Sequence, residues 1–486
     1  MNIKKADLLQ TQSYINGEWR DAESGGTFDV RNPATGEVIA QVADAGAVET
    51  QQAIEAANAA LPAWRAKTAK ERAKILHRWF TLVMEHQDDL AAILTAEQGK
   101  VLSEAAGEIA YGANYIEWFS EEAKRVYGDI IPPPNGDRRI VVVKQPVGVV
   151  ASITPWNFPN AMLARKVAPA LAAGCTFVAK PAKETPLSAL ALAVLGEEAG
   201  IPPGVFNLIC GHSSQAIGGE LTGNPLVRKL TFTGSTGVGK LLMKQCADTV
   251  KKTSMELGGN APFIVFDDAD LDAAIAGAMA SKYRNAGQTC VCTNRFLIQE
   301  GIYDRFAERL MAEVKKFQLG NGADADSTMG PLVTKTAVDG VDELVQDAVA
   351  KGAEAVLGGG RSELGDCYYQ PTVLLNATRE MRVFREEIFG PVSPLFRFKT
   401  EAEAVEMAND TEFGLAAYFY TRDLSRSWRV GEALEYGIVG INEGAISNEM
   451  APFGGIKESG NGREGSKYGI DDYLEIKYMC MGGLDN

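Results

Sequence analysis

The sequence predicts an α/β protein with a parallel, doubly wound sheet at its centre. Between residues 146 and 260, short apolar segments alternate with longer segments of helical periodicity, an order typical of parallel sheets. The predicted strands are residues 147–153, 176–179, 205–209 and 229–232, and the predicted helices are residues 161–173, 186–199 and 213–221. Polar or Gly-rich motifs follow three of these strands, at the edge where such sheets bind ligands.

Length and composition indicate the class of protein. With 486 residues, the chain has room for two or three domains of about 150 residues each. Its 46% hydrophobic and 23% charged residues are typical of a globular protein, and its net charge of −15 argues against nucleic acid or an anionic membrane as a partner. Seven scattered cysteines indicate reduced thiols, and neither a signal-peptide-like start nor an apolar run of about 18 residues is present. We therefore expect a cytoplasmic protein.

The first 130 residues are predicted to form short strands followed by helices. Strands are expected near residues 14–19 and 28–30, where turn residues separate short β-forming runs. Apolar residues at three- and four-residue spacing predict helices within residues 46–98, and a further helix covers residues 103–126.

Two strongly β-forming segments lie outside these units. Residues 138–144 follow the break at Pro132-Pro133-Pro134 and have no neighbouring strand in the local sequence, while residues 473–479 alternate as a strand near the C-terminus. An apolar strand without a local sheet is a candidate for pairing with another subunit.

A second α/β unit is predicted over residues 261–440. It begins with a strand at 262–266, a helix at 270–283, a strand at 295–300 and a helix at 301–316. Two α/β units predict an active site between domains, where ligand sites are common.

Cys290 is the first candidate for the chemistry. It lies among small and polar residues within 284–294, which favours a partly exposed turn where a thiolate can form; the alternative is a buried thiol that packs as a small hydrophobe. Cys292 lies two residues on, either unoxidised or able to form a strained, reversible disulfide with Cys290. No His or Cys of matching spacing accompanies the pair, so we expect no metal site.

The glycines that follow the predicted strand 229–232 are ambiguous by themselves. Gly234, Gly237 and Gly239 do not fit G-x-G-x-x-G, so a structural turn and a phosphate-binding loop at a helix start both remain open. Glu256 lies near the distance at which a Rossmann acidic residue binds ribose. It precedes two glycines, however, in a predicted turn better suited to aiming a carboxylate into a cleft.

Five motifs, in order along the chain, together resemble the NAD(P)-dependent aldehyde dehydrogenase superfamily. They are Pro155-Trp156-Asn157-Phe158-Pro159, Phe232-Thr233-Gly234-Ser235-Thr236, Glu256-Leu257-Gly258-Gly259, Gly287-Gln288-Thr289-Cys290 and Glu387-Ile388-Phe389-Gly390-Pro391. The resemblance covers essentially the whole chain. Within the superfamily it is strongest to the bacterial succinate-semialdehyde dehydrogenases, through residues 284–292 and 462–470.

The resemblance implies an aldehyde dehydrogenase-like fold with two domains and an arm. It assigns residues 1–129 and 147–258 to a Rossmann-type cofactor-binding domain and residues 259–465 to an α/β catalytic domain. Residues 130–146 and 466–486 are implied to form a β oligomerisation arm, which gives a homodimer or homotetramer.

Aldehyde oxidation requires a nucleophile, because a carbonyl carbon has no hydride to give until it becomes tetrahedral. A Cys290 thiolate can form a thiohemiacetal that expels hydride and becomes a thioester. The resemblance implies that the Asn157 amide and the Cys290 backbone N–H stabilise the oxyanion. Deacylation requires a base, and with no His in a motif, Glu256 is the candidate.

The resemblance also implies which residues contact the cofactor. Lys180 matches a ribose contact, Ser235 a pyrophosphate contact and Glu387 a nicotinamide-ribose contact. The remaining residues assigned to the cofactor site are Trp156, Gly234, Gly239, Leu257 and Phe389, of which Trp156 and Phe389 would also serve as core residues.

The implied substrate is a short aldehyde with a distal carboxylate. Arg165, Arg284 and Ser447 match positions that bind this carboxylate in succinate-semialdehyde dehydrogenases, and a planar guanidinium suits a carboxylate. The alternative for either Arg is a surface ion pair. The expected reaction is oxidation of succinate semialdehyde to succinate, as in 4-aminobutyrate degradation. Glutarate semialdehyde, one methylene longer, and a broader range of aldehydes are the alternatives.

Lys183 indicates the coenzyme. NAD-preferring relatives often carry a Glu at the matching position, which would repel the extra phosphate of NADP+, whereas this chain offers a cation. We therefore expect NADP+ in preference to NAD+. Glu184 could pair with Lys183 and weaken this effect, and a solvated surface Lys is the alternative.

Two other classes of protein compete with the dehydrogenase. A cysteine hydrolase or acyltransferase would need a His to activate the thiol, and none of His77, His86 and His212 lies in such a motif. A non-catalytic protein with the same fold would be expected to have lost Cys290 or Glu256, and both are present.

Overall fold

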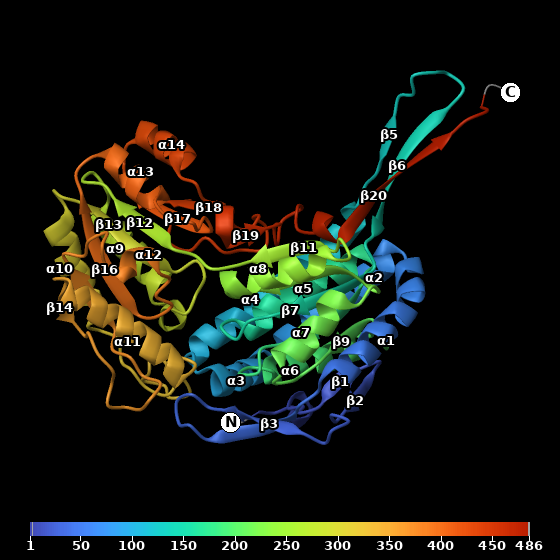
Figure 1. Ribbon diagram of the computed structural model, residues 1–486, viewed down its shortest axis with the longest axis horizontal. Coiled ribbons are helices and arrows are strands. Elements are labelled where there is room, and N and C mark those ends of the chain that lie inside the picture. Colours follow the sequence, from blue (N-terminus) through green and yellow to red (C-terminus); the bar gives the residue numbers. More distant parts are fainter. Residues whose placement is uncertain (2, 485–486) are drawn as a thin grey trace.

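The computed structural model contains two large sheets, each with its own core, and a projecting arm (Figure 1). It describes residue 1 and residues 3–484. Residues 2, 485 and 486, which belong to the predicted ranges 1–129 and 466–486, lie outside the described residues. Among the residues described, no helix combines the length and apolar character needed to cross a membrane.

The first sheet has eight strands and confirms the predicted alternation of strands and helices. Across the sheet the strands are β19 (Gly460–Asn461), β11 (Lys252–Glu256), β10 (Val227–Thr233), β7 (Val149–Ile153), β8 (Thr176–Lys180), β9 (Phe206–Leu208), β1 (Ser13–Ile15) and β2 (Glu18–Arg20). The five strands from β11 to β9 are parallel. The short strand β19 comes from the range predicted for the catalytic domain, yet it pairs with β11 here.

Helices connect the parallel strands and pack on the sheet. The crossover helices are α5 (Pro159–Ala173), α6 (Leu187–Ala199), α7 (Ser214–Gly223) and α8 (Thr236–Ala247). The N-terminal region adds the hairpin β3 (Thr27–Arg31) and β4 (Val38–Ala43), and helices α1 (Ala47–Ala66), α2 (Ala69–Glu85), α3 (Gln87–Gln98) and α4 (Leu102–Glu122). The predicted helix 103–126 ends in a 3-10 turn at Ala123–Arg125.

Helix α5 occupies the centre of this first unit. All of its residues are buried, and α4 packs along it. Gly174, with φ 98°, ends the helix in the left-handed conformation that glycine adopts without strain. Full burial means that the charged α5 residues Arg165 and Lys166 need partners inside the protein.

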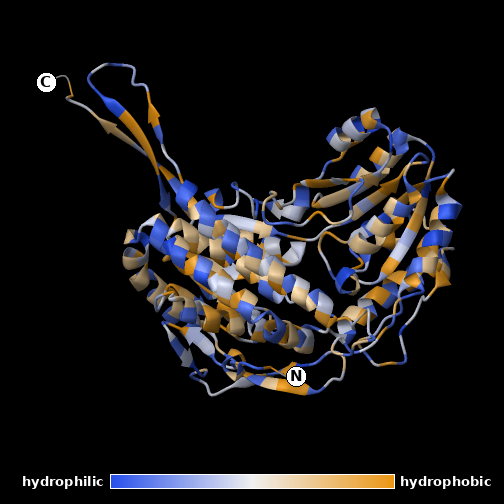
Figure 2. Ribbon diagram, turned by 180° about the vertical axis from the view of Figure 1, so that it is seen from behind, coloured by the Kyte–Doolittle hydropathy of each residue, from blue (hydrophilic) through white to orange (hydrophobic). Residues whose placement is uncertain are grey.

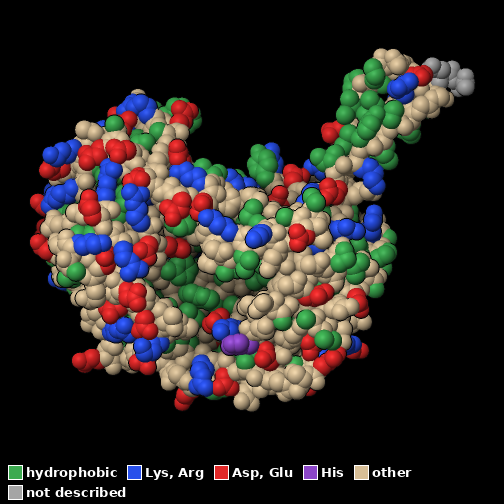
Figure 3. Space-filling view, in the orientation of Figure 1, with side chains coloured by type: hydrophobic (Ala, Val, Ile, Leu, Met, Phe, Trp, Pro, Cys, Tyr) green, Lys and Arg blue, Asp and Glu red, His purple; other side chains and the backbone are tan. Residues whose placement is uncertain are grey.

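The second sheet has seven strands, six of them parallel. Across the sheet they are β14 (Glu354–Leu357), β15 (Thr372–Leu375), β16 (Val392–Phe398), β13 (Thr293–Gln299), β12 (Ala261–Val265), β17 (Ala416–Tyr420) and β18 (Ile438–Ile441), and β14 is the antiparallel strand. Its helices are α9 (Leu271–Lys282), α10 (Tyr303–Val314), α11 (Lys335–Ala350), α12 (Arg382–Arg385), α13 (Glu401–Asn409) and α14 (Leu424–Ala433). Figure 3 shows a hollow between the two lobes in which hydrophobic side chains are exposed.

The arm is a three-stranded antiparallel sheet that extends away from both lobes (Figure 1). Strand β6 (Arg139–Pro146) pairs with β5 (Asp129–Ile131) on one edge and β20 (Leu474–Met481) on the other. The expectation that residues 138–144 lack a local sheet was therefore wrong, because the nearby strand β5 pairs with β6. The pairing of β6 with β20 joins the two segments that the resemblance assigned to one arm. Hydrophobic stretches run along these strands in Figure 2, and Ile130 and Ile476 are 81% and 72% exposed.

Candidate active site

Most of the predicted active-site residues lie around one cavity of about 260 Å³ between the two lobes. Eight of them line it, namely Trp156, Asn157, Gly234, Ser235, Leu257, Cys290, Glu387 and Phe389. They come from the ends of β7, β10 and β11 and from two loops of the second lobe, which agrees with ligand binding at the carboxyl ends of parallel strands. Trp156 and Phe389 meet edge to face, with ring centroids 5.6 Å apart.

A second cavity of about 630 Å³ adjoins the first and extends between α7 and α8. Lys180 and Lys183 line it, and Trp156, Gly234 and Ser235 line both cavities. An elongated site with two halves suits a dinucleotide. Thr233 also lines both halves, and its Oγ1 is buried without a hydrogen-bond partner among the described residues.

Helix α8 begins at this junction. Its N-cap residue Ser235 makes no side-chain capping bond, so the hydroxyl and the first backbone N–H groups of the helix can face an anion. Gly239 lines neither cavity, which differs from its predicted place in the cofactor site. A Cβ at Gly239 would lie 2.4 Å from a methyl carbon of Leu257, so this glycine allows the helix to pack closely on the Leu257 loop.

Lys183 and Glu184 both line the 630 Å³ cavity. The Lys183 side chain is exposed, and no ion pair joins it to Glu184 within the described part of the chain. The contact between Lys183 and the coenzyme stays a prediction. Lys180 is buried, its Nζ lies 3.3 Å from the carbonyl oxygen of Pro181, and burial lowers its pKa.

A strained loop carries Cys290. Asn285 and Ala286 both have φ 54° and Gly287 has φ 79°, so three successive residues adopt the left-handed conformation. For Ala286 this costs about 1–2 kcal/mol. A Cβ at Gly287 would lie 2.3 Å from the carbonyl oxygen of Gly390, which explains the glycine. The strain persists only because surrounding contacts fix the loop, and such strain is common at functional sites.

Asn157 and the Cys290 loop are held together by hydrogen bonds. The Asn157 side-chain amide donates to the carbonyl oxygen of Gln288 at 3.0 Å, and the Asn157 carbonyl oxygen accepts from the Asn285 amide at 3.0 Å. Lys100 Nζ donates to that same carbonyl oxygen at 2.7 Å and forms a buried ion pair with Glu108 at 2.5 Å. The sequence analysis missed Lys100 and Glu108, because neither belongs to the motifs that carried the resemblance.

Cys290 is half-buried in a turn, which agrees with the predicted setting. Burial raises the pKa of its thiol to about 12, while the Arg165 guanidinium lowers this pKa and the Glu256 carboxylate raises it. Cys292 is buried and its thiol donates to the Lys282 carbonyl oxygen at 3.2 Å. Both cysteines are free thiols in the structure.

Glu256 is the last residue of β11, and the predicted turn begins only after it. The sequence interpretation was wrong on this point because the strand extends through Glu256. The carboxylate is 4% exposed, and its Oε2 has no hydrogen-bond partner among the described residues. Burial and the neighbouring Glu464 raise the pKa of Glu256 well above its usual value, while Arg165 and Lys166 lower it. A buried carboxylate of raised pKa is suited to general base chemistry.

The three residues predicted to bind a substrate carboxylate do not line one cavity. Arg284 and Ser447 share a cavity of about 320 Å³, and Arg165 is not among its lining residues. Arg165 is 1% exposed and its Nη2 lies 2.6 Å from Glu464 Oε2, while its guanidinium lies 4.1 Å from the Phe453 ring centroid. Arg165 therefore already has a carboxylate partner, which agrees with the alternative of an ion pair except that the pair is buried and not at the surface.

Cys290 lies between the cavity of about 260 Å³ and the cavity of about 320 Å³. Its side chain lines the 260 Å³ cavity, and its neighbours Thr289 and Val291 line the 320 Å³ cavity that contains Arg284 and Ser447. A molecule in one of these cavities would therefore meet a molecule in the other at Cys290.

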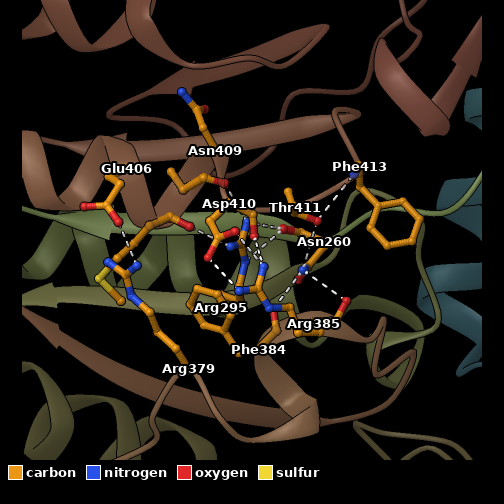
Figure 4. A network of polar contacts seen from close by, with 12 residues as sticks. Asn260, Arg295, Arg379, Phe384, Arg385, Glu406, Asn409, Asp410, Thr411 and Phe413 are labelled. Carbon is orange, nitrogen blue, oxygen red and sulfur yellow. Dashed lines mark hydrogen bonds and ion pairs between the residues drawn. The ribbon is translucent and has the colours of Figure 1, made fainter.

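A buried polar network fixes the loop after Glu256 against the second lobe (Figure 4). The Arg295 guanidinium donates to the carbonyl oxygens of Asn260, Met407 and Ala408 at 2.8–2.9 Å. It also lies 5.1 Å from the Phe384 ring centroid. Because Arg295 is on β13, the strand that follows the Cys290 loop, this network holds the two loops in one position.

Asn294 extends the network to Glu387. Its amide donates to Asn260 Oδ1 at 2.7 Å and to the carbonyl oxygen of Glu386 at 2.9 Å, and its Oδ1 accepts from the Ile388 N–H at 2.9 Å. These bonds bracket Glu387 on both sides. Burial raises the pKa of Glu387 to about 8.

Comparison with known proteins identifies the family. The aldehyde dehydrogenase family matches residues 19–479. The succinate-semialdehyde dehydrogenase [NADP(+)] of Escherichia coli is 63% identical over 482 residues, which are 99% of this chain and 100% of that protein. The glutarate-semialdehyde dehydrogenase of Pseudomonas aeruginosa is 62% identical over 484 residues, which are 100% of both chains.

A solved structure gives the same answer for the fold. The crystal structure of an Escherichia coli NADP-dependent enzyme superposes with a TM-score of 0.98 at 62% identity, and the match covers 99% of this chain and 100% of that one. The predicted superfamily and fold class are therefore confirmed. The chain belongs to the aldehyde dehydrogenase family.

Proposed function

We propose that the protein oxidises succinate semialdehyde to succinate, with NADP+ in preference to NAD+. The observation that carries this proposal is the position of Cys290 between two groups of cavities. On one side are the joined cavities of about 260 and 630 Å³, and on the other is the cavity lined by Arg284 and Ser447. The names of the Escherichia coli and Pseudomonas aeruginosa relatives support an aldehyde with a distal carboxylate as the substrate.

Cys290 acts as the nucleophile in this proposal. Its sulfur adds to the aldehyde carbon as the thiol proton passes to solvent, and the oxyanion is stabilised by the Asn157 side-chain amide and the Cys290 backbone N–H. NADP+ bound in the two joined cavities would supply the hydride acceptor. Trp156, Lys180, Ser235 and their neighbours would hold it, and the acyl group remains on Cys290 as a thioester.

Glu256 then activates the water that hydrolyses the thioester. Its Oε2 is buried and makes no hydrogen bond among the described residues, so a water beside it would satisfy this oxygen. Burial keeps its pKa high enough for the carboxylate to take a proton readily. A cysteine hydrolase would use no oxidant and form no NADPH, so an increase in absorbance at 340 nm during turnover with NADP+ would exclude that alternative.

The substrate preference is tested with three aldehydes. We expect kcat/KM to be higher for succinate semialdehyde than for uncharged butyraldehyde, and Arg284→Met to lower the succinate semialdehyde value about ten- to a hundredfold, because one charged hydrogen bond contributes roughly 1.5–3 kcal/mol. Butyraldehyde oxidation should be unchanged in this variant, and Arg305→Met, an exposed arginine on α10, is the control. Equal wild-type values for the two aldehydes would contradict carboxylate recognition. A higher value for glutarate semialdehyde would favour the longer substrate.

The coenzyme preference is tested at Lys183. An exposed charge contact contributes about 1 kcal/mol or less, so Lys183→Glu should raise KM for NADP+ by up to about fivefold and leave KM for NAD+ nearly unchanged. Lys244→Glu, at an exposed position on α8, controls for the change in net charge. A wild-type enzyme that prefers NAD+, or a variant with both KM values unchanged, would show that Lys183 is not the selector.

We further propose a cytoplasmic homodimer or homotetramer assembled through the arm. The exposed apolar side chains of β5 and β20, such as Ile130 and Ile476, support this assembly, because isolated arms rarely expose such residues without a partner. The predicted place in 4-aminobutyrate degradation rests on the substrate proposal.

A further inference from the structure

We propose that Glu104 discriminates against dianions in the substrate cavity and thereby favours release of the product. This inference rests on the proposed function. Glu104 lines the same 320 Å³ cavity as Arg284 and Ser447, and Thr289 and Val291, which flank Cys290, line it too. An anionic side chain is an unexpected component of a cavity proposed to bind a carboxylate.

The Glu104 carboxylate is fixed in place. It lies in the first turn of α4, and its Oε1 accepts the backbone N–H of Asn285 at 3.0 Å. Asn285 is the first residue of the strained run before Cys290, so the carboxylate cannot leave the cavity wall without breaking a contact of the nucleophile loop. Burial raises the pKa of Glu104 above its usual value and the neighbouring Glu108 adds to the rise, while the Asn285 N–H and the cations Lys100 and Arg284 oppose it.

Arg284 does not neutralise Glu104 directly. Within the part of the chain that the structure describes, no ion pair joins the two side chains, and Arg284 is exposed with its guanidinium 5.0 Å from the Phe158 ring centroid. The cavity therefore presents an unpaired cation and a fixed anion. One substrate carboxylate can be matched by Arg284, and a second negative charge has no cation left to match it.

Substrate and product differ by one such charge. Succinate semialdehyde carries a single carboxylate, and hydrolysis of the thioester on Cys290 creates a second one. The product dianion is then repelled by Glu104 more than the substrate is, since like charges in one cavity repel whether or not they touch. Glu104 thus weakens the binding of succinate more than it weakens the binding of succinate semialdehyde.

The test compares product inhibition in the wild-type enzyme and in Glu104→Gln. Gln keeps an oxygen that can accept the Asn285 N–H and removes only the charge. We expect the inhibition constant of succinate against the aldehyde to fall about two- to fivefold, and the inhibition constant of butyrate, a monoanion, to fall less. Glu121→Gln, at an exposed position on the same helix, should change neither constant.

An unchanged ratio of the succinate and butyrate inhibition constants would overturn the inference, whether neither constant changes or both fall by the same factor. It would show that the charge of Glu104 does not discriminate between a dianion and a monoanion. Glu104→Ala tests the contact with the Cys290 loop separately. It removes the acceptor of the Asn285 N–H, so it should lower kcat for butyraldehyde as well. The proposed function fails separately, if the wild-type enzyme oxidises butyraldehyde and succinate semialdehyde equally well.

Discussion

Cys290→Ala should form no NADPH with succinate semialdehyde while it still binds the coenzyme. Without a nucleophile there is no tetrahedral adduct from which hydride can leave, so kcat should fall by at least about 10³-fold. Coenzyme affinity should stay within about twofold of the wild-type value, because Cys290 is one of many residues that line the cofactor cavities. Absorbance at 340 nm measures the first quantity and quenching of tryptophan fluorescence the second.

Cys367→Ala is the matched control for this variant. Cys367 is also a half-buried thiol, yet it lies outside both cofactor cavities. Its replacement should leave kcat unchanged. Sustained turnover by Cys290→Ala would remove Cys290 as the nucleophile, and loss of coenzyme binding would indicate that the loop has collapsed and that its strain depends on this side chain.

Glu256→Gln should release about one equivalent of NADPH per active site and then nearly stop. Acylation of Cys290 needs no base at Glu256 in the proposed chemistry, whereas hydrolysis of the thioester does, and loss of a general base lowers a rate by about 10²–10⁴-fold. Gln matches Glu in shape, so packing at this buried position should be preserved. Stopped-flow absorbance at 340 nm resolves the burst from the steady state.

Glu308→Gln, an exposed residue of α10, should show wild-type turnover. The wild-type deacylation rate should rise with pH, because the raised pKa of Glu256 leaves the carboxyl protonated at low pH and only the ionised form is a base. A Glu256→Gln variant with the wild-type steady-state rate would show that another group activates the water.

The sequence predicted the first sheet well because its strands and helices alternate with clear differences in periodicity. The strands around Val149 and Phe177 are short apolar runs, and the motifs that follow them meet at one cavity because parallel strands end on the same edge. The strand pairing in the arm was harder to predict from residue patterns. Strand β6 pairs with β20, which is more than 300 residues away in the sequence, and no local pattern encodes such a pairing.

The surroundings of the candidate site were not predictable in the same way. Lys100, Glu104, Glu108 and Glu464 are charged residues on helices or loops, and in a sequence such residues look like an ordinary solvated surface. Lys100, Glu108 and Glu464 are nevertheless buried and Glu104 is half-buried, because α5 is fully covered and segments far apart in the chain meet there. Arg165 shows the consequence, because its motif position predicted a substrate contact and the structure gives it Glu464 as a partner.

The central claim is that the substrate becomes covalently attached to Cys290. The most direct test is to mix Glu256→Gln with succinate semialdehyde and NADP+, quench the mixture in acid at the end of the burst and map the peptides by mass spectrometry. The proposed mechanism predicts a succinyl adduct on the peptide that contains Cys290, in an amount equal to the NADPH formed. NADPH formation without an adduct, or an adduct on another residue, would contradict it.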